Sequence, residues 1–331
     1  MKALVFTDKE KLSYQSIPSP IPKEDEELIK VNATGICGSD MHAYHGHDER
    51  RLPPLILGHE ISGVIENSKK NVVINPLVTC GKCYECQNEI EHLCQSRGLI
   101  GMSKPTERQG GFAEYVSVPK RNLHYTNNTD LITKLALTEP TAVSYHAIQL
   151  AIQHSIKLLN KSNILIIGGG AIGLLAGLIL NTMGIENYTI TDTNQKRLNV
   201  CKKAANCEVE LPDSKKIKDN SYDVIIDAVG LEKTRHQSIA CVKQGGLIIH
   251  IGLSEPSGNF NFRKATLQEI VFVGTYCYTN DDFKKTLDLL AKRQIGSLNW
   301  IEYRSLKDGS FAFKEIHNGS CSSPKIVLLV A

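Results

Sequence analysis

The sequence contains no run of about eighteen apolar residues, so nothing in it predicts a helix that spans a membrane. Its opening stretch, MKALVFTDKEKLSYQ, is too briefly apolar for a signal peptide and predicts a strand instead. The 38 basic and 35 acidic residues form no block of one sign, which argues against a nucleic-acid partner. Internal repeats and low-complexity linkers are also absent. We therefore expect a cytoplasmic protein that binds neither membranes nor nucleic acids.

The length and the local patterns predict two domains. At 331 residues the chain is too long for one ordinary core. Residues 1–140 carry short β-branched runs broken by Gly, Pro and Asn, which predict antiparallel β structure with long loops. Beyond them, helical stretches alternate with compact apolar strands, a pattern typical of a parallel sheet covered on both faces. The expected elements are strands at 164–167, 188–191, 222–226, 247–251 and 270–273, a helix at 280–294 and a final strand, KIVLLV.

Cysteine spacing supplies the most specific motif. Cys80, Cys83, Cys86 and Cys94 have the spacing CxxCxxCx7C, typical of a thiolate cage around one zinc ion. Four sulfur ligands leave no position for water or substrate, so we expect this zinc to be structural. Cys37 belongs to a different motif. The other thiols are scattered as reduced, packed cysteines would be, consistent with a cytoplasmic location: Cys201, Cys207, Cys241, Cys277 and Cys321.

A glycine-rich turn predicts a dinucleotide site. In NILIIGGGAIGLLAGLIL, Gly168, Gly170 and Gly173 form GxGxxG between an apolar strand and an apolar helix, and Ile172 lies within the turn. The next expected strand ends at Asp192, where a carboxylate can accept hydrogen bonds from an adenosine ribose. This acid would repel the 2′-phosphate of NADP and favours NAD. Arg197, in the following helix, is either a further cofactor contact or a surface residue.

Upstream of the cage, two short motifs predict an open metal site. GICGSDMH contains Cys37, Ser39, Asp40 and His42, and GHE contains His59 and Glu60. Cysteine, histidine and carboxylate are the ligands of catalytic zinc sites, which leave one position for water or substrate. His45 and His47 also lie in this polar region, and we interpret them as surface residues.

Taken together, GICGSDMH, LGHEISG, the four cysteines, GGFAEYV, TEPTAVSYHA and GGGAIG resemble the zinc-containing medium-chain dehydrogenases over essentially the whole chain. The resemblance implies an α/β protein with a GroES-like, β-barrel-like catalytic domain and a Rossmann domain with a doubly wound parallel sheet. The expected boundaries are 1–140 for the first domain, with a structural-zinc lobe at about 76–97, then 141–273 for the Rossmann domain and 274–331 for a return to the first.

The resemblance also implies a ligand set for a second, catalytic zinc. Cys37 and His59 match family ligands, and Glu60 matches an acid that ligates directly or exchanges with water. Glu139, followed by Pro140, matches the glutamate found in the polyol branch in place of a cysteine of alcohol dehydrogenases. A carboxylate at this position suits a substrate with vicinal hydroxyls. The alternative for Glu139 is a cap on a helix that begins near Pro140.

The implied reaction transfers a hydride between a secondary alcohol, polyol or sugar alcohol and NAD. Two zinc ions and NAD are the expected cofactors, and homodimers or homotetramers the expected assemblies. Ser39 and His42 match the family's proton relay, and Asp40 is expected to orient His59. A surface position remains the alternative for His42. L-threonine-type dehydrogenase activity and a non-catalytic relative that binds the cofactor are the competing functions.

At two places the sequence departs from the family pattern, which limits how far the family's residue roles apply to this chain. The stretch 63–75 lacks the GDRV sequence and predicts a tight hairpin near residues 68–71. Thr275 stands where sorbitol dehydrogenases carry an arginine that helps hold the polyol, although Tyr276 is kept beside it. Phosphorylated sugar alcohols also fit this branch of the family, but the sequence shows no basic cluster that could be assigned to a phosphate.

Overall fold

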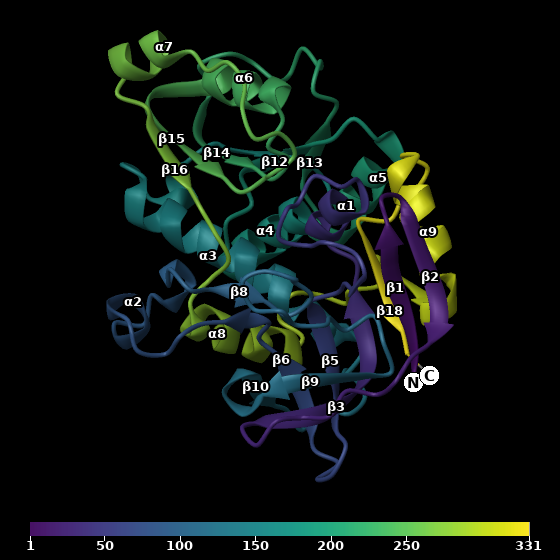
Figure 1. The fold of residues 1–331 in the computed structure, drawn as a ribbon. Coiled ribbons are helices and arrows are strands. Elements are labelled where there is room, and N and C mark those ends of the chain that lie inside the picture. The colour runs from purple at the N-terminus through teal and green to yellow at the C-terminus, as the bar shows by residue number, and fades with distance from the viewer. Residues whose placement is uncertain (331) are drawn as a thin grey trace.

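Residues 1–330 are described by a computed structural model, in which the first half of the chain forms two main sheets and a two-stranded sheet in a small lobe (Figure 1). The smaller sheet has the order β2-β1-β4, and the larger has the order β10-β6-β5-β3-β18-β17 with β9 paired to β3. Pairing within the first half is antiparallel, as the sequence predicted. These strands are β1 (Lys2–Asp8), β2 (Lys11–Ser16), β3 (Glu26–Gly35), β4 (Leu55–Ile56), β5 (Glu60–Ile65), β6 (Asn71–Ile74), β9 (Tyr115–Pro119) and β10 (Leu123–Tyr125).

Short elements decorate this half. The helix α1 (Gly38–Tyr44) follows β3 directly, and a small lobe projects between β6 and β9. The lobe contains β7 (Leu77–Val78), α2 (Tyr84–Gln87), η1 (Glu91–Leu93) and β8 (Gly98–Leu99). The remaining short 3-10 helices of the chain are η2 (Lys120–Asn122), η3 (Lys134–Leu137), η4 (Leu159–Lys161) and η5 (Leu306–Asp308).

The second half contains a six-stranded parallel sheet with the order β13-β12-β11-β14-β15-β16, in the upper part of Figure 1. Every residue of its central strand β11 is buried, because helices cover both faces of the sheet. The strands are β11 (Ile164–Ile167), β12 (Tyr188–Thr191), β13 (Glu208–Glu210), β14 (Tyr222–Asp227), β15 (Val242–His250) and β16 (Val271–Gly274). The helices are α4 (Ala171–Thr182), α5 (Gln195–Ala205), α6 (Glu232–Cys241) and α7 (Phe262–Leu267).

After β16 the chain returns to the first half through α8 (Asn280–Ala291), β17 (Ile301–Ser305), α9 (Gly309–His317) and β18 (Lys325–Leu329). The strand β18 lies between β3 and β17, antiparallel to β3, with Leu328 opposite Thr34. The C-terminal strand is thus part of a sheet formed mainly by the first half of the chain (Figure 1). The long helix α3 (Thr138–His154) packs against α4 and α8 and joins the halves, and one buried apolar cluster contains residues of both.

The predicted fold class is confirmed, and the element boundaries differ only locally. The strand predicted at 247–251 begins earlier, at Val242, and the short edge strand β13 was missed because it has only three residues and two of them are glutamates. The helix predicted at 280–294 ends at Ala291, and its start is fixed by a capping box between Thr279 and Asp282. The predicted hairpin is the short turn between β5 and β6. Among residues 1–330, no helix is long and apolar enough to cross a membrane.

Candidate functional site

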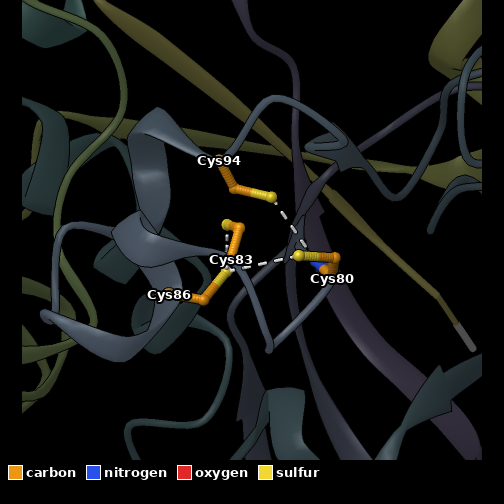
Figure 2. Close-up of side chains that lie close together, drawn as sticks. All are labelled: Cys80, Cys83, Cys86 and Cys94. Atoms are coloured by element: carbon orange, nitrogen blue, oxygen red, sulfur yellow. Dashed lines mark hydrogen bonds between the residues drawn. The ribbon is translucent and has the colours of Figure 1, made fainter.

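The four predicted cage cysteines meet in the lobe. Their sulfur atoms all lie within 4.8 Å of one another and turn toward a common centre (Figure 2). The Cys83 and Cys86 sulfurs are 3.5 Å apart, and those of Cys80 and Cys86 are 3.9 Å apart. Four ligands at about 2.3 Å from a tetrahedral zinc would be separated by about 3.8 Å. The sulfurs therefore fit a zinc ion with only small adjustments.

A second group of metal-ligating atoms lies where β3, α1 and β5 meet. Donor atoms of Cys37, His59 and Glu60 all lie within 4.8 Å of one another. Cys37 precedes α1, and Glu60 opens β5 directly opposite Gly35 at the end of β3. A Cβ atom on Gly35 would lie 1.7 Å from Glu60 Oε2, so only glycine leaves room for this carboxylate. Two sequence motifs, GICG and GHE, are thereby brought to one point.

The residues around this group hold His59 in place. Asp40 is completely buried, and its Oδ1 lies 3.4 Å from His59 Nδ1. Its other oxygen accepts a hydrogen bond from the Cys37 backbone N–H at 3.0 Å. Burial opposes the charged form of each partner, but their mutual attraction is stronger: the pKa of Asp40 is lowered and that of His59 is well above its usual value. Ser39 Oγ lies 3.4 Å from His59 Nε2.

Arg51 is a buried residue of this site that the sequence analysis missed. Its Nη2 donates to Ser39 Oγ at 3.4 Å, and its Nη1 donates to Asp48 Oδ2 at 2.5 Å. Only 2% of the residue is exposed. No sequence signal distinguished it, because it lies in the run HDERR, which is typical of a solvated loop.

A buried ion pair joins Glu60 to the end of the chain. Lys325 Nζ donates to Oε1 and Oε2 of Glu60 at 2.6 and 2.8 Å, and to the Ile36 carbonyl at 2.9 Å. The charge of Glu60 raises the pKa of Lys325 against the opposing effect of burial. This lysine was not among the residues predicted from the sequence. The signal available in the sequence was its position at the start of the otherwise apolar strand KIVLLV, because a lysine buried there requires a partner.

Glu139 lies at the N-terminal end of α3, close to the same group. It is buried, and desolvation raises its pKa to about 7 although the positive charge of His59 opposes this. The fully buried Tyr278 acts in the opposite direction and lowers the pKa of Glu139. The helix begins at Thr138, its N-cap is Leu137, and no side chain caps it. The alternative that Glu139 caps the helix is therefore wrong, and its carboxylate faces the buried polar group.

The glycine turn lies between β11 and α4, as predicted. Gly168 has a φ of +103°, which favours glycine, and a Cβ on Gly173 would lie 1.8 Å from the Gly168 carbonyl oxygen. A Cβ on Gly170, by contrast, would meet nothing within 4 Å. The first and third glycines thus serve the turn and the packing, while Gly170 faces open space in which a pyrophosphate could approach the backbone.

Asp192 lies at the end of β12 and contacts this turn. Its Oδ2 accepts a hydrogen bond from the Gly169 N–H at 2.8 Å, and its Oδ1 accepts one from the Asn194 N–H at 2.7 Å. Arg197 Nη1 lies 3.3 Å from Asp192 Oδ2, and its Nη2 donates to the Cys321 carbonyl. The interpretation of Arg197 as a surface residue is not supported, because the side chain is half-buried against Asp192.

Two cavities lie at the junction of the halves. One, of about 310 Å³, is lined by Cys37 and Glu60 at one end and by Ile172, Asp192 and Arg197 at the other. It therefore connects the open ligand group with the glycine turn.

The second cavity, of about 1180 Å³, is lined by Ser39 and His42 among others. Desolvation lowers the pKa of His42, which makes no hydrogen bond to Ser39 among residues 1–330. The two predicted relay residues thus share a cavity without direct contact.

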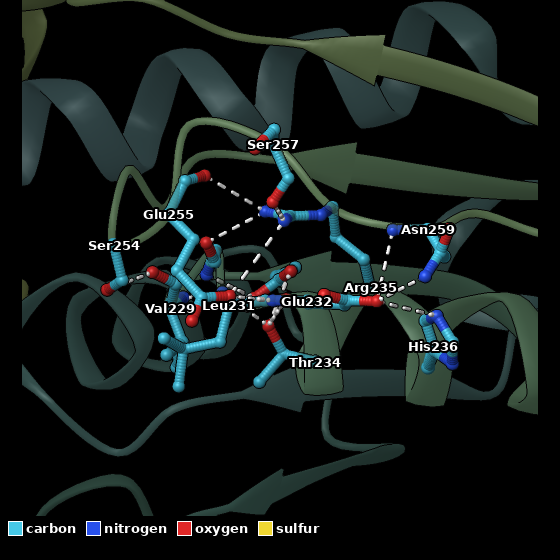
Figure 3. Close-up of polar contacts among 12 residues, drawn as sticks. Val229, Leu231, Glu232, Thr234, Arg235, His236, Ser254, Glu255, Ser257 and Asn259 are labelled. Carbon is cyan, nitrogen blue, oxygen red and sulfur yellow. Dashed lines mark hydrogen bonds and ion pairs between the residues drawn. The ribbon is translucent and has the colours of Figure 1, made fainter.

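The wall of the larger cavity is fixed by the loops that follow β14 and β15 (Figure 3). Arg235 Nη1 donates to the carbonyls of Gly230 and Glu255 at 2.9 and 3.2 Å, and Nη2 donates to that of Ser257. Thr234 Oγ1 donates to Asp227 Oδ2 at 3.0 Å. These bonds tie the two loops together at the carboxyl ends of the strands, where open α/β sheets bind their ligands.

Comparison with known proteins agrees with this geometry. The family model for the alcohol dehydrogenase GroES-like domain matches residues 23–128, and that for zinc-binding dehydrogenases matches residues 171–292. Together they cover about two thirds of the chain. The fold and site define an oxidoreductase that uses zinc and a nicotinamide cofactor. The chain belongs to the zinc-containing medium-chain dehydrogenase family.

Individual relatives match along nearly the whole chain. The L-galactonate-5-dehydrogenase of Escherichia coli K12 is 29% identical over 323 residues, covering 92% of this chain and 91% of that protein. The sorbitol dehydrogenase of Halalkalibacterium halodurans is 28% identical and covers 96% and 97%. The structure of acetophenone reductase from Geotrichum candidum in complex with NAD has a TM-score of 0.87 at 26% identity, covering 99% and 96%. The expected family, fold and enzyme class are confirmed.

Proposed function

We propose that this enzyme oxidises a secondary hydroxyl of a polyol or sugar alcohol to a ketone, with NAD as the acceptor of the hydride. The observation that carries the proposal is the open group of Cys37, His59 and Glu60, with Glu139 beside it, at one end of a cavity that reaches the glycine turn. Two of the three relatives named above are dehydrogenases of L-galactonate and of sorbitol, both of which are polyhydroxylated chains.

We propose Cys37, His59 and Glu139 as the protein ligands of the catalytic zinc, with Glu139 ligating directly or through one water. A zinc ion at this point would act as a Lewis acid and lower the pKa of the substrate hydroxyl. Both oxygens of Glu60 accept hydrogen bonds from Lys325, so the charge of Glu60 is already paired. This favours water over Glu60 as the remaining ligand. The four lobe cysteines would hold the second zinc, which stays structural.

The surrounding residues support a path for the hydroxyl proton. We propose that Ser39, which lies between His59 and Arg51, accepts the proton from the substrate and passes it to His42 in the larger cavity. The lowered pKa of His42 keeps its imidazole neutral and able to accept a proton. Asp40 fixes the ring of His59 and takes no proton itself, because its own pKa is lowered.

A substrate screen tests the proposed function. Polyols, diols, sugar alcohols and L-threonine are offered with NAD, and formation of the reduced nicotinamide is followed by its absorbance. We expect turnover of at least one polyol or sugar alcohol, and a loss of activity that parallels removal of one zinc per chain by a chelator. Activity on L-threonine alone would indicate the competing dehydrogenase. A zinc-replete, folded protein that binds NAD and turns over none of these compounds would point to the non-catalytic alternative.

The preference for NAD over NADP rests on Asp192. A charge-assisted hydrogen bond contributes roughly 1.5 to 3 kcal/mol, so Asp192→Ala should weaken NAD binding about ten- to a hundredfold. The substitution also frees Arg197 from its partner at 3.3 Å, and NADP should bind more tightly than it does to the wild type. Titration of both cofactors against wild type, Asp192→Ala and Asp192→Ala/Arg197→Ala measures each effect. Equal affinity of the wild type for the two cofactors would contradict the assignment.

We propose the boundaries 1–140, 141–273 and 274–331 for the domains, supported by the return of β17 and β18 to the first sheet. We also propose a cytoplasmic homodimer or homotetramer. Three exposed apolar side chains on α7 and on β16, the edge strand of the parallel sheet, support an assembly. They are Phe262, Leu267 and Phe272.

A further inference from the structure

A buried polar cluster outside the proposed catalytic site joins three separate segments of the chain. His146 lies on α3, and its Nδ1 lies 2.8 Å from Asp282 Oδ2 on α8. The ring of His92, from η1 of the lobe, stands edge-on to the His146 ring with 4.9 Å between their centres. All three residues are buried. None of them was predicted from the sequence, and none takes part in the proposed reaction.

The bonds made by Asp282 show that His146 Nδ1 is the donor of this pair. Asp282 Oδ2 also accepts from the N–H and from the hydroxyl of Thr279, at 3.0 and 2.8 Å, within the capping box of α8. Burial raises the pKa of Asp282, but the hydrogen bonds outweigh burial and keep this pKa below its usual value, so the group stays ionised and can only accept. His146 Nδ1 therefore carries a proton and donates in a directional hydrogen bond between α3 and α8.

The lobe holds the α8 side of this cluster at two further points. Glu91 Oε1 accepts a hydrogen bond from the Asn280 N–H at 2.6 Å, in the first turn of α8, where a negative charge is favourable. The guanidinium carbon of Arg97 lies 4.7 Å from the centre of the Tyr276 ring, within the range of a cation–π interaction. Arg97 Nη1 also donates to the Cys94 carbonyl at 3.0 Å. The chain that leads from the parallel sheet into α8 is thus held against the lobe.

The other partner, α3, also carries Glu139. Seven residues separate Glu139 from His146, which is about two turns of an α-helix, so both side chains lie on the same side of α3. His146 therefore anchors α3 about 10 Å along the helix axis from the proposed metal ligand. Apolar packing also holds this helix in the core, but such packing is non-directional, whereas a satisfied buried polar network selects one arrangement.

We propose that His146 is a positioning residue for the catalytic metal. Its hydrogen bond to Asp282, covered by the ring of His92, fixes the rotation and the axial position of α3 and so places the Glu139 carboxylate at the open ligand group. This inference rests on the proposed role of Glu139 as a ligand. His146 acts through α3 and touches neither the metal nor the substrate. The lobe then serves catalysis as well as stability, because it supplies His92 and holds α8 in place.

A catalytic role for the pair of His146 and Asp282 is less suitable. In the part of the chain that the structure describes, neither residue lines either cavity at the junction of the halves. Both are buried between helices, where a substrate has no access to them. The pair is therefore placed to hold the helices and not to exchange protons with a substrate.

The test measures how firmly the open site holds its metal, which requires no substrate. A chelator is added to wild type, His146→Leu and His146→Asn, and the release of each zinc ion is followed over time. His146→Leu removes the donor, and we expect one zinc to leave about tenfold faster, at the lower end of the range for residues that orient metal ligands, while the lobe zinc is retained. His146→Asn keeps an N–H donor and should recover most of the retention. The value of kcat on the best substrate of the screen should change in parallel.

Cobalt(II) in place of zinc identifies which ion is affected. Four thiolates would surround the ion in the lobe and a single thiolate the ion in the open site, so the two give different absorption spectra. In His146→Leu we expect a shifted spectrum for the open site and an unchanged spectrum for the lobe. His154→Leu is the matched control, because His154 is an exposed histidine on the same helix. It should behave as wild type in both measurements.

A double-mutant cycle with Glu139→Gln tests whether His146 acts through Glu139. In the Glu139→Gln background, His146→Leu should cause little further loss of metal, because the carboxylate that it positions is already gone. If His146→Leu is insoluble, Asp282→Asn supplies the same comparison, since it keeps the volume of the side chain and weakens the bond to His146.

The outcomes separate the inference from the proposed function. A His146→Leu protein with a lowered thermal midpoint but wild-type metal retention, cobalt spectrum and kcat would show a structural role only and overturn the inference. Additive effects of the two substitutions would also overturn it, because His146 would then act on another part of the site. Wild-type metal retention in Glu139→Gln would instead refute the ligand set of the proposed function, and the inference would fall with it.

Discussion

Glu139→Ala should lower turnover by at least about 10- to 100-fold and reduce the zinc content toward one ion per chain. The carboxylate is buried beside His59 and Glu60, and it has no capping role in α3 that could account for its position. If Glu139 is the proposed ligand, its removal takes one oxygen from the catalytic zinc and leaves the four sulfurs of the lobe untouched. Zinc per chain and kcat on the best substrate of the screen are measured on the same preparation.

Glu139→Gln is the matched variant, because it keeps the volume and one acceptor oxygen of the side chain while removing the charge. It should resemble Glu139→Ala in zinc content and turnover if the carboxylate serves the metal. A Glu139→Ala protein with two zinc ions, unchanged turnover and a lowered melting point would refute the ligand assignment. The glutamate would then have a structural role only, and the argument for polyols from its hard oxygen ligand would no longer hold.

Cys86→Ser should remove the other zinc and lower the stability of the protein substantially. Structural zinc contributes on the order of 10 kcal/mol of binding free energy in small domains, and the lobe offers little else to hold it together. Its helix α2 contains no buried residue, whereas Leu77 and Leu99 of β7 and β8 belong to the main buried cluster. We therefore expect a lower thermal midpoint and faster proteolysis between residues 80 and 94, measured by calorimetry and mass spectrometry.

Cys241→Ser is the control for this variant. Cys241 is a buried cysteine at the end of α6 that belongs to neither ligand group, so its replacement should leave both zinc ions in place. A soluble Cys86→Ser protein that retains two zinc ions and the wild-type midpoint would show that the cage is not a metal site.

Local patterns were sufficient to predict the parallel sheet and the composition of both ligand groups. The strands β11 and β12 have the predicted bounds. Every residue of β11 is buried, β12 consists of β-branched and aromatic residues, and both strands are bounded by polar or glycine residues. The cage cysteines lie within fifteen residues, so spacing alone brings them together. Cys37 and His59 are further apart, and their proximity was inferred from the family resemblance.

The missed residues depend on contacts between distant segments. Lys325 meets Glu60 across 265 positions of the chain, through the register of β18 on β3. A lone lysine or arginine carries no spacing signal, because its usual place is the solvated surface. Such pairs become visible only when the three-dimensional structure places the segments together.

The position of β18 also determines when the active enzyme can form during synthesis. The sheet that carries Glu60 lacks its β18 partner, and the buried carboxylate lacks Lys325, until residues 325–329 have left the ribosome. The parallel sheet, whose strands lie between residues 164 and 274, can fold before that point because all of its strands are already available. The sheet of the first half is therefore synthesised first but completed last. A chain released before Lys325 has been added would contain a folded cofactor-binding sheet and an incomplete metal site.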